Sequence, residues 1–323
     1  MQGGELLGFS ERAAHLAFVA DIGTTTVATL LVDLGNRDIL AVRGERNAQA
    51  SYGADVVSRI QHGMEEGPAP LQKAIVGQIE ALLSSMLEEA GQSDVSLICL
   101  TGNTTMIHLL CGLPAGNISR APFIPVIIGA MRRNGRELGL NSDAPVYLPP
   151  GISAYIGADI TTALLAADAA GSEENFLLID FGTNAETVLY ADGEFYACSA
   201  AAGPCFEGAC LSCGMAGQSG AIDTVYAAPE GLGFTVLGGT EARGLCGSGC
   251  IDALALLLRS GHVDETGRLS AEPLAESDLP ASCLAGIGAR IRDDRLYITP
   301  DVYLSQKDIR EVQLAKAAVR AGI

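Results

Sequence analysis

The sequence predicts an α/β fold made of two lobes. Segments typical of strands alternate with segments typical of amphipathic helices in both halves of the chain. A hairpin with the pattern D-[IF]-G-T occurs twice, in VADIGTTTVATLLV and in LLIDFGTNAETVLY, once at the start of each half. A length of 323 residues suits one large domain or two ordinary ones. The repeated hairpin therefore indicates an internal duplication.

In the first half, apolar residues recur with the period of a helix in two long segments, and continuous apolar runs predict buried strands. We expect strands at about 17–34, 38–45 and 95–103, and helices at 53–66, 71–91 and 156–167. Residues 113–147, rich in Pro, Gly and Arg, are expected to be irregular, and residues 1–16 to form a loose leader.

The second half opens with the hairpin at 176–190. We expect further strands in EFYACSAAAG and GFTVLGG, a helix in CIDALALLLRSG, a polar connection at 262–286 and an amphipathic helix at the end. A Gly- and Cys-rich segment, GPCFEGACLSCGMAGQSGAID, lies between EFYACSAAAG and GFTVLGG. With a linker near 170–175, the lobes are expected at 17–170 and 171–323.

Composition excludes some classes of protein. The net charge of -18 argues against a nucleic-acid partner, because phosphate backbones are bound by Lys and Arg. Backbone N–H groups and a metal ion can still bind a nucleotide. No apolar run reaches the ~18 residues of a membrane span, and the N-terminus lacks signal-peptide features. Nine Cys, an odd number, favour free thiols in a reducing cytoplasm.

The two hairpins carry matching polar residues at their turns. Asp21 corresponds to Asp180, Gly23 to Gly182 and Thr24 to Thr183. Each strand end places a carboxylate at the mouth of a sheet, while Gly lets the backbone approach a ligand and Thr hydroxyls and N–H groups face an anion. Two such turns across a cleft would grip nucleotide phosphates, with Mg²⁺ held through water by the two carboxylates. The alternative is that each Asp caps its own turn.

Three further places could carry chemistry. Asp159, at the start of a helix, could orient or deprotonate a water that attacks a γ-phosphate, or could simply favour the helix N-terminus. The Gly-rich GLCGSG before a helix could let a nucleotide lie on the backbone, with Gly238 and Gly239 adding to it. Asn103 and Thr104 could touch a ligand at the sheet edge, or only cap a helix.

The cysteines permit a second interpretation of part of the chain. Cys205, Cys210 and Cys213 have the C-x4-C-x2-C spacing of plant-type ferredoxins, and Cys246 or Cys250 could be a fourth ligand. Small buried thiols in an Ala- and Gly-rich segment are the alternative that we favour. The four His residues show no ligand spacing.

These motifs resemble the acetate and sugar kinase/Hsp70/actin (ASKHA) superfamily, as a ribonuclease-H-like duplication in two lobes. As a set they look like the reductive activators of corrinoid proteins. The stretches that carry the resemblance run over residues 17–323: DIGTTTVATLLVDL, GNTTMIHLL, LPPGISAYIGADITTALLA, LLIDFGTNAETVL, FEGACLSCGMAGQSGAID, GLCGSGCIDAL and SQKDIREVQLAKAAVRAGI.

The resemblance implies an ATPase that couples ATP, with Mg²⁺, to the reduction of Co(II) to Co(I) in a corrinoid protein, using electrons from a ferredoxin-type iron–sulfur donor. It implies these site residues: Asp21, Gly23, Thr24, Thr25 and Thr26 in the first phosphate loop, Asp180, Gly182, Thr183 and Asn184 in the second, and Gly247, Ser248 and Gly249 near the nucleoside. Asp21, Asp159 and Asp180 are the expected catalytic residues.

The sequence departs from the family pattern at its ends. Family members usually carry a ferredoxin-like domain with an iron–sulfur cluster and continue to a Gly-rich adenosine loop, and neither is expected here, so the second lobe is expected to be incomplete. Two other functions stay open: a small-molecule kinase of the same fold, and a non-enzymatic module that docks a corrinoid protein or forms a homodimer.

Overall fold

The computed structural model describes residues 15–172 and 174–323. It divides into two compact units, unit 1 (Met1–Glu174) and unit 2 (Asn175–Ile323). Most of the expected leader, residues 1–14, lies outside the described residues, and the first strand begins at Leu16.

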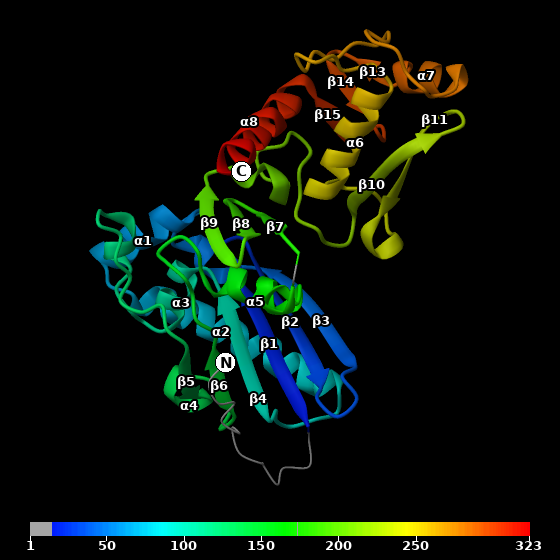
Figure 1. Ribbon diagram of the computed structural model, residues 1–323. Coiled ribbons are helices and arrows are strands. Elements are labelled where there is room, and N and C mark those ends of the chain that lie inside the picture. Colours follow the sequence, from blue (N-terminus) through cyan, green and yellow to red (C-terminus); the bar gives the residue numbers. More distant parts are fainter. Residues whose placement is uncertain (1–14, 173) are drawn as a thin grey trace. The chain divides into compact units, whose positions relative to one another are not determined.

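Unit 1 is built on one six-stranded sheet with the order β3-β2-β1-β4-β6-β5 (Figure 1). Its strands are β1 (Leu16–Ile22), β2 (Thr26–Asp33), β3 (Ile39–Arg46), β4 (Leu97–Gly102), β5 (Met131–Asn134) and β6 (Pro145–Leu148). The first three strands form an antiparallel meander, and β4 then pairs in parallel with both β1 and β6. The carboxyl ends of β1 and β4 therefore lie side by side, as the predicted site requires.

Helices cover this sheet and enclose a hydrophobic core. The helices of unit 1 are η1 (Ala48–Ser51), α1 (Val56–Glu65), α2 (Ala69–Glu89), α3 (Thr104–Leu110), η2 (Gly116–Ser119), α4 (Gly135–Leu138), α5 (Ala158–Ala166) and η3 (Ala169–Gly171). In α2 the buried residues Leu71, Ile75, Ile79, Leu82 and Met86 are three or four positions apart, so they form one apolar stripe. The helices expected at 53–66, 71–91 and 156–167 are thus confirmed; the first and third are shorter than expected, and the second begins and ends two residues earlier.

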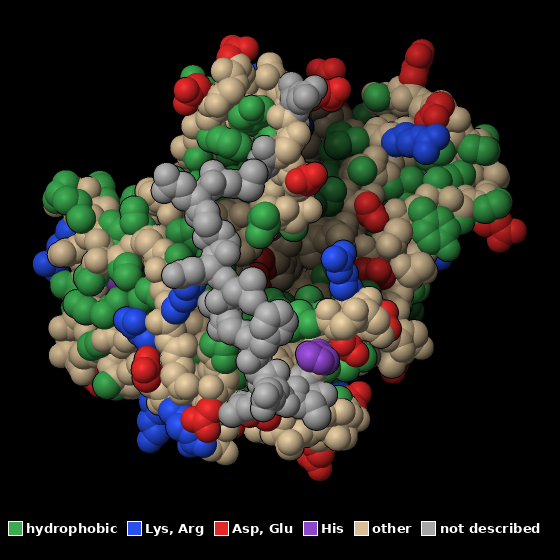
Figure 2. Space-filling model, turned by 60° about the horizontal axis from the view of Figure 1, so that its bottom comes forward, with side chains coloured by type: hydrophobic (Ala, Val, Ile, Leu, Met, Phe, Trp, Pro, Cys, Tyr) green, Lys and Arg blue, Asp and Glu red, His purple; other side chains and the backbone are tan. Residues whose placement is uncertain are grey.

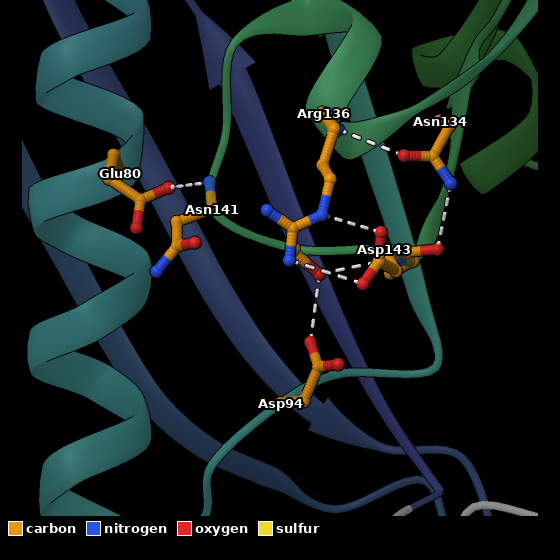
Figure 3. A network of polar contacts seen from close by, with 8 residues as sticks. Glu80, Asp94, Asn134, Arg136, Asn141 and Asp143 are labelled. Atoms are coloured by element: carbon orange, nitrogen blue, oxygen red, sulfur yellow. Dashed lines mark hydrogen bonds and ion pairs between the residues drawn. The ribbon is translucent and has the colours of Figure 1, made fainter.

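The prediction that 113–147 is irregular was wrong. This segment contains β5, α4 and the start of β6, which complete the edge of the sheet. Polar contacts hold this segment in place. Within it, Arg136 donates to both carboxylate oxygens of Asp143, and the backbone N of Asn141 donates to Glu80 on α2 (Figure 3). These strands were missed because each is only four residues long and carries charged or turn-forming residues.

Unit 2 begins with a second meander, ordered β7-β8-β9, that repeats β1-β2-β3. Its elements are β7 (Phe176–Phe181), β8 (Ala185–Ala191), β9 (Glu194–Ala200), η4 (Pro204–Glu207), β10 (Ala221–Ala228), β11 (Gly231–Val236), η5 (Leu237–Gly239), β12 (Gly244–Leu245), α6 (Gly247–Arg259), α7 (Ala281–Gly288), β13 (Ile291–Arg292), β14 (Arg295–Tyr297), β15 (Tyr303–Ser305) and α8 (Gln306–Gly322). The hairpin predicted from the repeat and the strand predicted in EFYACSAAAG are both confirmed.

Two parts of unit 2 differ from the expectation. The Gly- and Cys-rich segment runs into β10, which pairs with β11 and β12, and the polar connection at 262–286 ends in α7. A small sheet, β13-β14-β15, then precedes α8. Helix α8 packs against β8 and β9, and its buried Asp308 accepts hydrogen bonds from Ser305 and from the backbone N of Ser212. The terminal helix is confirmed, and it anchors the Cys-rich loop.

The surface agrees with the acidic composition. On the face drawn in Figure 2, Lys and Arg side chains form small separate groups among Asp, Glu and neutral residues. Among the residues that the structure describes, no helix combines the length and the apolar character needed to cross a bilayer.

Candidate functional site

The first D-x-G-T turn joins β1 to β2 and is closed by its own backbone. The backbone N of Gly23 donates to the Thr26 carbonyl at 3.0 Å. A Cβ on Gly23 would lie 2.6 Å from that carbonyl oxygen, which is too close for any other residue. This glycine is therefore required by the turn itself, in addition to any ligand it approaches.

Three successive carbonyls of this turn are held by two residues from outside the hairpin. Asn47 donates from Nδ2 to the Gly23 oxygen and from its backbone N to the Thr25 oxygen, both at 2.8 Å. Arg59 donates from Nη2 to the Thr24 oxygen at 2.7 Å. The turn consequently has a fixed backbone conformation before any ligand arrives.

A second loop meets the first turn through Asn103. Its side chain caps α3 by accepting from the Met106 backbone N at 3.0 Å, and its Nδ2 donates to Thr24 Oγ1 at 3.1 Å. Thr104 donates from Oγ1 to the Ser153 carbonyl at 2.6 Å. The expectation of a helix cap at Asn103 is confirmed, and the same residue also orients a threonine of the turn.

Helix α5 begins against this second loop. A Cβ on Gly157, the residue before α5, would lie 2.5 Å from the Cα of Asn103, so only glycine allows this approach. Asp159 follows in the first turn of α5 and accepts the backbone N–H of Ile160 with Oδ1 at 2.9 Å. Unit 1 thus gathers the first turn, the β4–α3 loop and the start of α5 at one edge of its sheet.

Asp21 lies one residue before the end of β1 and is exposed. It is paired in register with Thr101 on β4, and Thr101 Oγ1 contacts Thr162 Oγ1 on α5 at 3.3 Å. Asp21 and the middle of α5 are thereby connected through β4. The side chains of Thr25 and Thr26 remain partly or largely accessible to solvent at the same turn.

The second D-x-G-T turn joins β7 to β8 and is held differently. Glu207, at the end of η4, accepts two hydrogen bonds with Oε1, from the backbone N and from Oγ1 of Thr183, each at 2.8 Å. The backbone N of Gly182 donates to the Asn184 carbonyl at 2.9 Å. A carboxylate thus fixes this turn where amide and guanidinium groups fix the first.

Acidic residues accumulate around the second turn. Asp180 pairs in register with Glu186, whose Oε1 accepts from Ser199 Oγ at 2.9 Å. Asp180 keeps access to solvent, yet partial burial and the nearby Glu207 raise its pKa above the ordinary value. Burial, opposed by the Ser199 hydrogen bond, also raises the pKa of Glu186. This end of the hairpin therefore disfavours further negative charge.

The predicted nucleoside loop has a close-packed backbone. A Cβ on Gly247 would lie 1.7 Å from the Phe206 carbonyl oxygen, and one on Gly249 would lie 2.3 Å from the Ile222 carbonyl oxygen. Both glycines are buried at the start of α6, while Ser248 is exposed and donates to the Asp223 carbonyl at 2.8 Å. Packing explains these two glycines, and their role toward a nucleoside stays a prediction. Gly238 and Gly239 lie in η5, both with positive φ.

The three cysteines with ferredoxin spacing differ in their surroundings. Cys205 is buried and Cys210 is exposed, and Cys213 donates to the Asp301 carbonyl. Within the described ranges, no three His, Cys, Asp or Glu residues are placed to hold a metal ion together. Burial raises the pKa of Cys205 to about 11, which disfavours the thiolate that a metal requires.

The sequence interpretation missed four residues that shape the turns: Asn47, Arg59, Glu186 and Glu207. Glu186 lies two positions after Asn184, and Glu207 is the acid of the FEGA motif, so the sequence contained a signal that could have identified both residues. The sequence contained no such signal for Asn47 and Arg59, because both lie outside the repeated pattern.

The fold and its sequence place the protein in the ASKHA class. Residues 174–323 match the family model described as the C-terminal domain of RACo, the ASKHA domain. Residues 16–171 match the model described as the RACo middle region. The chain belongs to the RACo family.

Relatives with names or solved structures support the same assignment. The chain is 32% identical over 316 residues to the corrinoid activation enzyme RamQ of Eubacterium limosum, covering 94% of this chain and 53% of the relative. It is 24% identical to the [Co(II) methylated amine-specific corrinoid protein] reductase of Methanosarcina barkeri, covering 94% and 57%. A solved reductive activator for corrinoid,iron-sulfur protein superposes with a TM-score of 0.84 at 32% identity, covering 97% and 51%. The chain thus spans about half the length of each relative.

Proposed function

We propose that this chain carries the ATP-binding and ATP-hydrolysing part of a reductive activator of a corrinoid protein. The observation that carries the nucleotide part is the first turn, whose three carbonyls are all bonded to Asn47 and Arg59. A turn fixed in this way is a prepared site for phosphate oxygens. The names of the relatives, which refer to corrinoid activation and corrinoid protein reduction, support the choice of acceptor.

The site residues have the following proposed roles. Thr24, Thr25 and Thr26 with Gly23 bind phosphate at the first turn, and Gly182, Thr183 and Asn184 do so at the second. Asp21 at the first turn and Asp180 at the second would each hold Mg²⁺ through water, and the ion would neutralise phosphate charge. The acidic residues fit this role, because a bound cation would favour the charged form of Asp180, whose pKa is raised by burial and secondarily by the charge of Glu207. Asp159 orients the attacking water, and Gly247–Gly249 border the nucleoside.

Reduction of one Co(II) to Co(I) consumes one electron. We assign this electron to a ferredoxin-type iron–sulfur donor, as the resemblance to reductive activators of corrinoid proteins implies. ATP binding and hydrolysis then act on the conformation of the protein, since a ligand shifts an equilibrium only through the states it prefers.

Hydrolysis of Mg·ATP tests this proposal, with and without a corrinoid protein in the Co(II) state. Asp180→Ala is the test variant, and Asp301→Ala, an exposed acid in the same unit, is the matched control. Formation of Co(I) is followed by visible absorption in the presence of a reduced ferredoxin.

Three results are informative. Hydrolysis that rises with the corrinoid protein, is lost in Asp180→Ala and is kept in Asp301→Ala supports the proposal. A rate of hydrolysis that does not change when the corrinoid protein is added, together with phosphorylation of a metabolite, indicates a small-molecule kinase instead. Stable binding of the corrinoid protein without any hydrolysis indicates a docking module.

A further inference from the structure

The donors that hold the first turn come from a segment outside the repeated hairpin. Asn47 precedes η1, and Arg59 lies on α1. Both are almost completely buried, with exposed fractions of 1% and 0%. Buried polar side chains of this size are rare unless their hydrogen bonds are satisfied, so their place beneath the turn is a specific feature.

The guanidinium group of Arg59 forms three contacts. Nε donates to the Gly53 carbonyl at 2.9 Å, Nη2 donates to the Thr24 carbonyl at 2.7 Å, and Nη1 lies 3.4 Å from the sulfur of Met106. Within the described ranges, no carboxylate forms an ion pair with it. Burial lowers its pKa to about 10, with the facing charges of Asp55 raising and Arg46 lowering it, so the group stays protonated at neutral pH.

The hydrogen bonds to the turn also determine where its N–H groups point. In a planar trans peptide the C=O of one residue and the N–H of the next point in opposite directions. With the carbonyls of Gly23, Thr24 and Thr25 directed at Asn47 and Arg59, the N–H groups of Thr24, Thr25 and Thr26 are directed to the opposite side. Successive N–H groups on one side of a turn form a concave site for an anion.

We propose that Asn47 and Arg59 are positioning residues for the triphosphate of ATP. They fix the first turn with its N–H groups directed at the phosphates, and Arg59 places a buried positive charge behind it. A buried charge is screened less than one in water, so it favours an anion on the far side of the turn. This inference rests on the proposed function, because it assigns residues to the same nucleotide site.

Isothermal titration of the whole chain with Mg·ATP tests the inference. Arg59→Met removes the charge and the hydrogen bonds and keeps most of the side-chain volume. Arg59→Lys keeps the charge, but a single ammonium cannot replace the planar fork. Asn47→Ser keeps a good cap for η1 and loses the donor to Gly23. Arg37→Met, in the exposed turn between β2 and β3, makes the same change of net charge elsewhere.

We expect Arg59→Met to weaken Mg·ATP binding by at least about tenfold, Arg59→Lys and Asn47→Ser by smaller factors, and Arg37→Met by less than about twofold. The number of sites per chain separates positioning from folding. A partly unfolded variant shows fewer sites with an unchanged Kd, whereas a misplaced turn shows a full number of sites with a raised Kd.

The results that overturn the inference are distinct from those that overturn the proposed function. A folded Arg59→Met with the Kd of the unmodified chain, or an equal loss in Arg37→Met, refutes the positioning role alone. An unmodified chain that binds no Mg·ATP refutes the proposed function and the inference with it. If Arg59→Met does not fold, the Kd values of Arg59→Lys and Asn47→Ser provide the test. A folded variant with the Kd of the unmodified chain again refutes the positioning role.

Discussion

Thr183 is bound twice by the same oxygen of Glu207. Its backbone N and its Oγ1 each lie 2.8 Å from Oε1, although the two residues are 24 positions apart in the chain. The other oxygen, Oε2, is buried and has no hydrogen-bond partner among the described residues. The second turn therefore depends on a loop that the repeated hairpin does not contain.

Removal of this carboxylate should destabilise unit 2. We expect Glu207→Ala to lower the free energy of unfolding by about 1–3 kcal/mol, because two donors of Thr183 lose their acceptor. Glu207→Gln should have a smaller effect, since its amide oxygen can still accept. Urea denaturation measures both, with the exposed Glu65→Ala as control. Equal stability of Glu207→Ala and the unmodified chain would contradict the contact.

Asp180 should make stability depend on pH. Its pKa is raised above the ordinary 3.8 by burial and by Glu207, so its protonated form favours the folded state. This stabilising effect is complete below pH 3.8 and is lost as pH rises through the raised pKa. We expect Asp180→Asn to increase Tm at pH 7 relative to the unmodified chain and to lose this advantage at acidic pH. A Tm difference that does not change with pH contradicts the raised pKa.

Two glycines should respond to alanine in opposite directions. Gly247→Ala places a Cβ against the Phe206 carbonyl at 1.7 Å, so the start of α6 must move, at a cost of about 1–3 kcal/mol or more. Gly77 is exposed in the middle of α2 with nothing within 4 Å, so Gly77→Ala should stabilise the chain by about 0.5–1 kcal/mol. Thermal unfolding compares them, and a tolerated Gly247→Ala would refute the close packing of α6.

The cysteines should differ in reactivity. The exposed Cys210 should react with a maleimide in the native protein. Cys250 is buried, and burial raises its pKa strongly, so it should react only after unfolding in guanidinium. Mass spectrometry of peptides locates the label. Rapid native labelling of Cys250 would show that the core around α6 opens to solvent.

Much of the fold could be predicted, because its signals are local. The repeated D-x-G-T hairpins, the apolar stripe of α2 and the capped helix α8 follow from periodicity and turn chemistry. The elements that were missed are short or mixed in composition. Strands β5 and β6 are four residues long, and β10 follows directly after a run rich in Gly and Cys.

The site could be predicted only where its residues lie in the repeat. Asp21, Gly23 and Thr24 were identified by their match to the second hairpin, and Asn103 by its cap position. Arg59 was not, because an Arg on an amphipathic helix normally faces water and its burial depends on contacts with Thr24 and Gly53. Contacts between segments distant in sequence leave no local pattern.

The two turns are held by groups of opposite hydrogen-bonding character. This difference limits whether one hairpin could replace the other. An amide and a guanidinium hold the first turn by its carbonyls, while a carboxylate holds the second by its N–H and hydroxyl. A hairpin transplanted from one unit to the other would keep its signature but meet a support of the wrong polarity. The two hairpins are thus not interchangeable parts, because the contacts around each one match only its own turn.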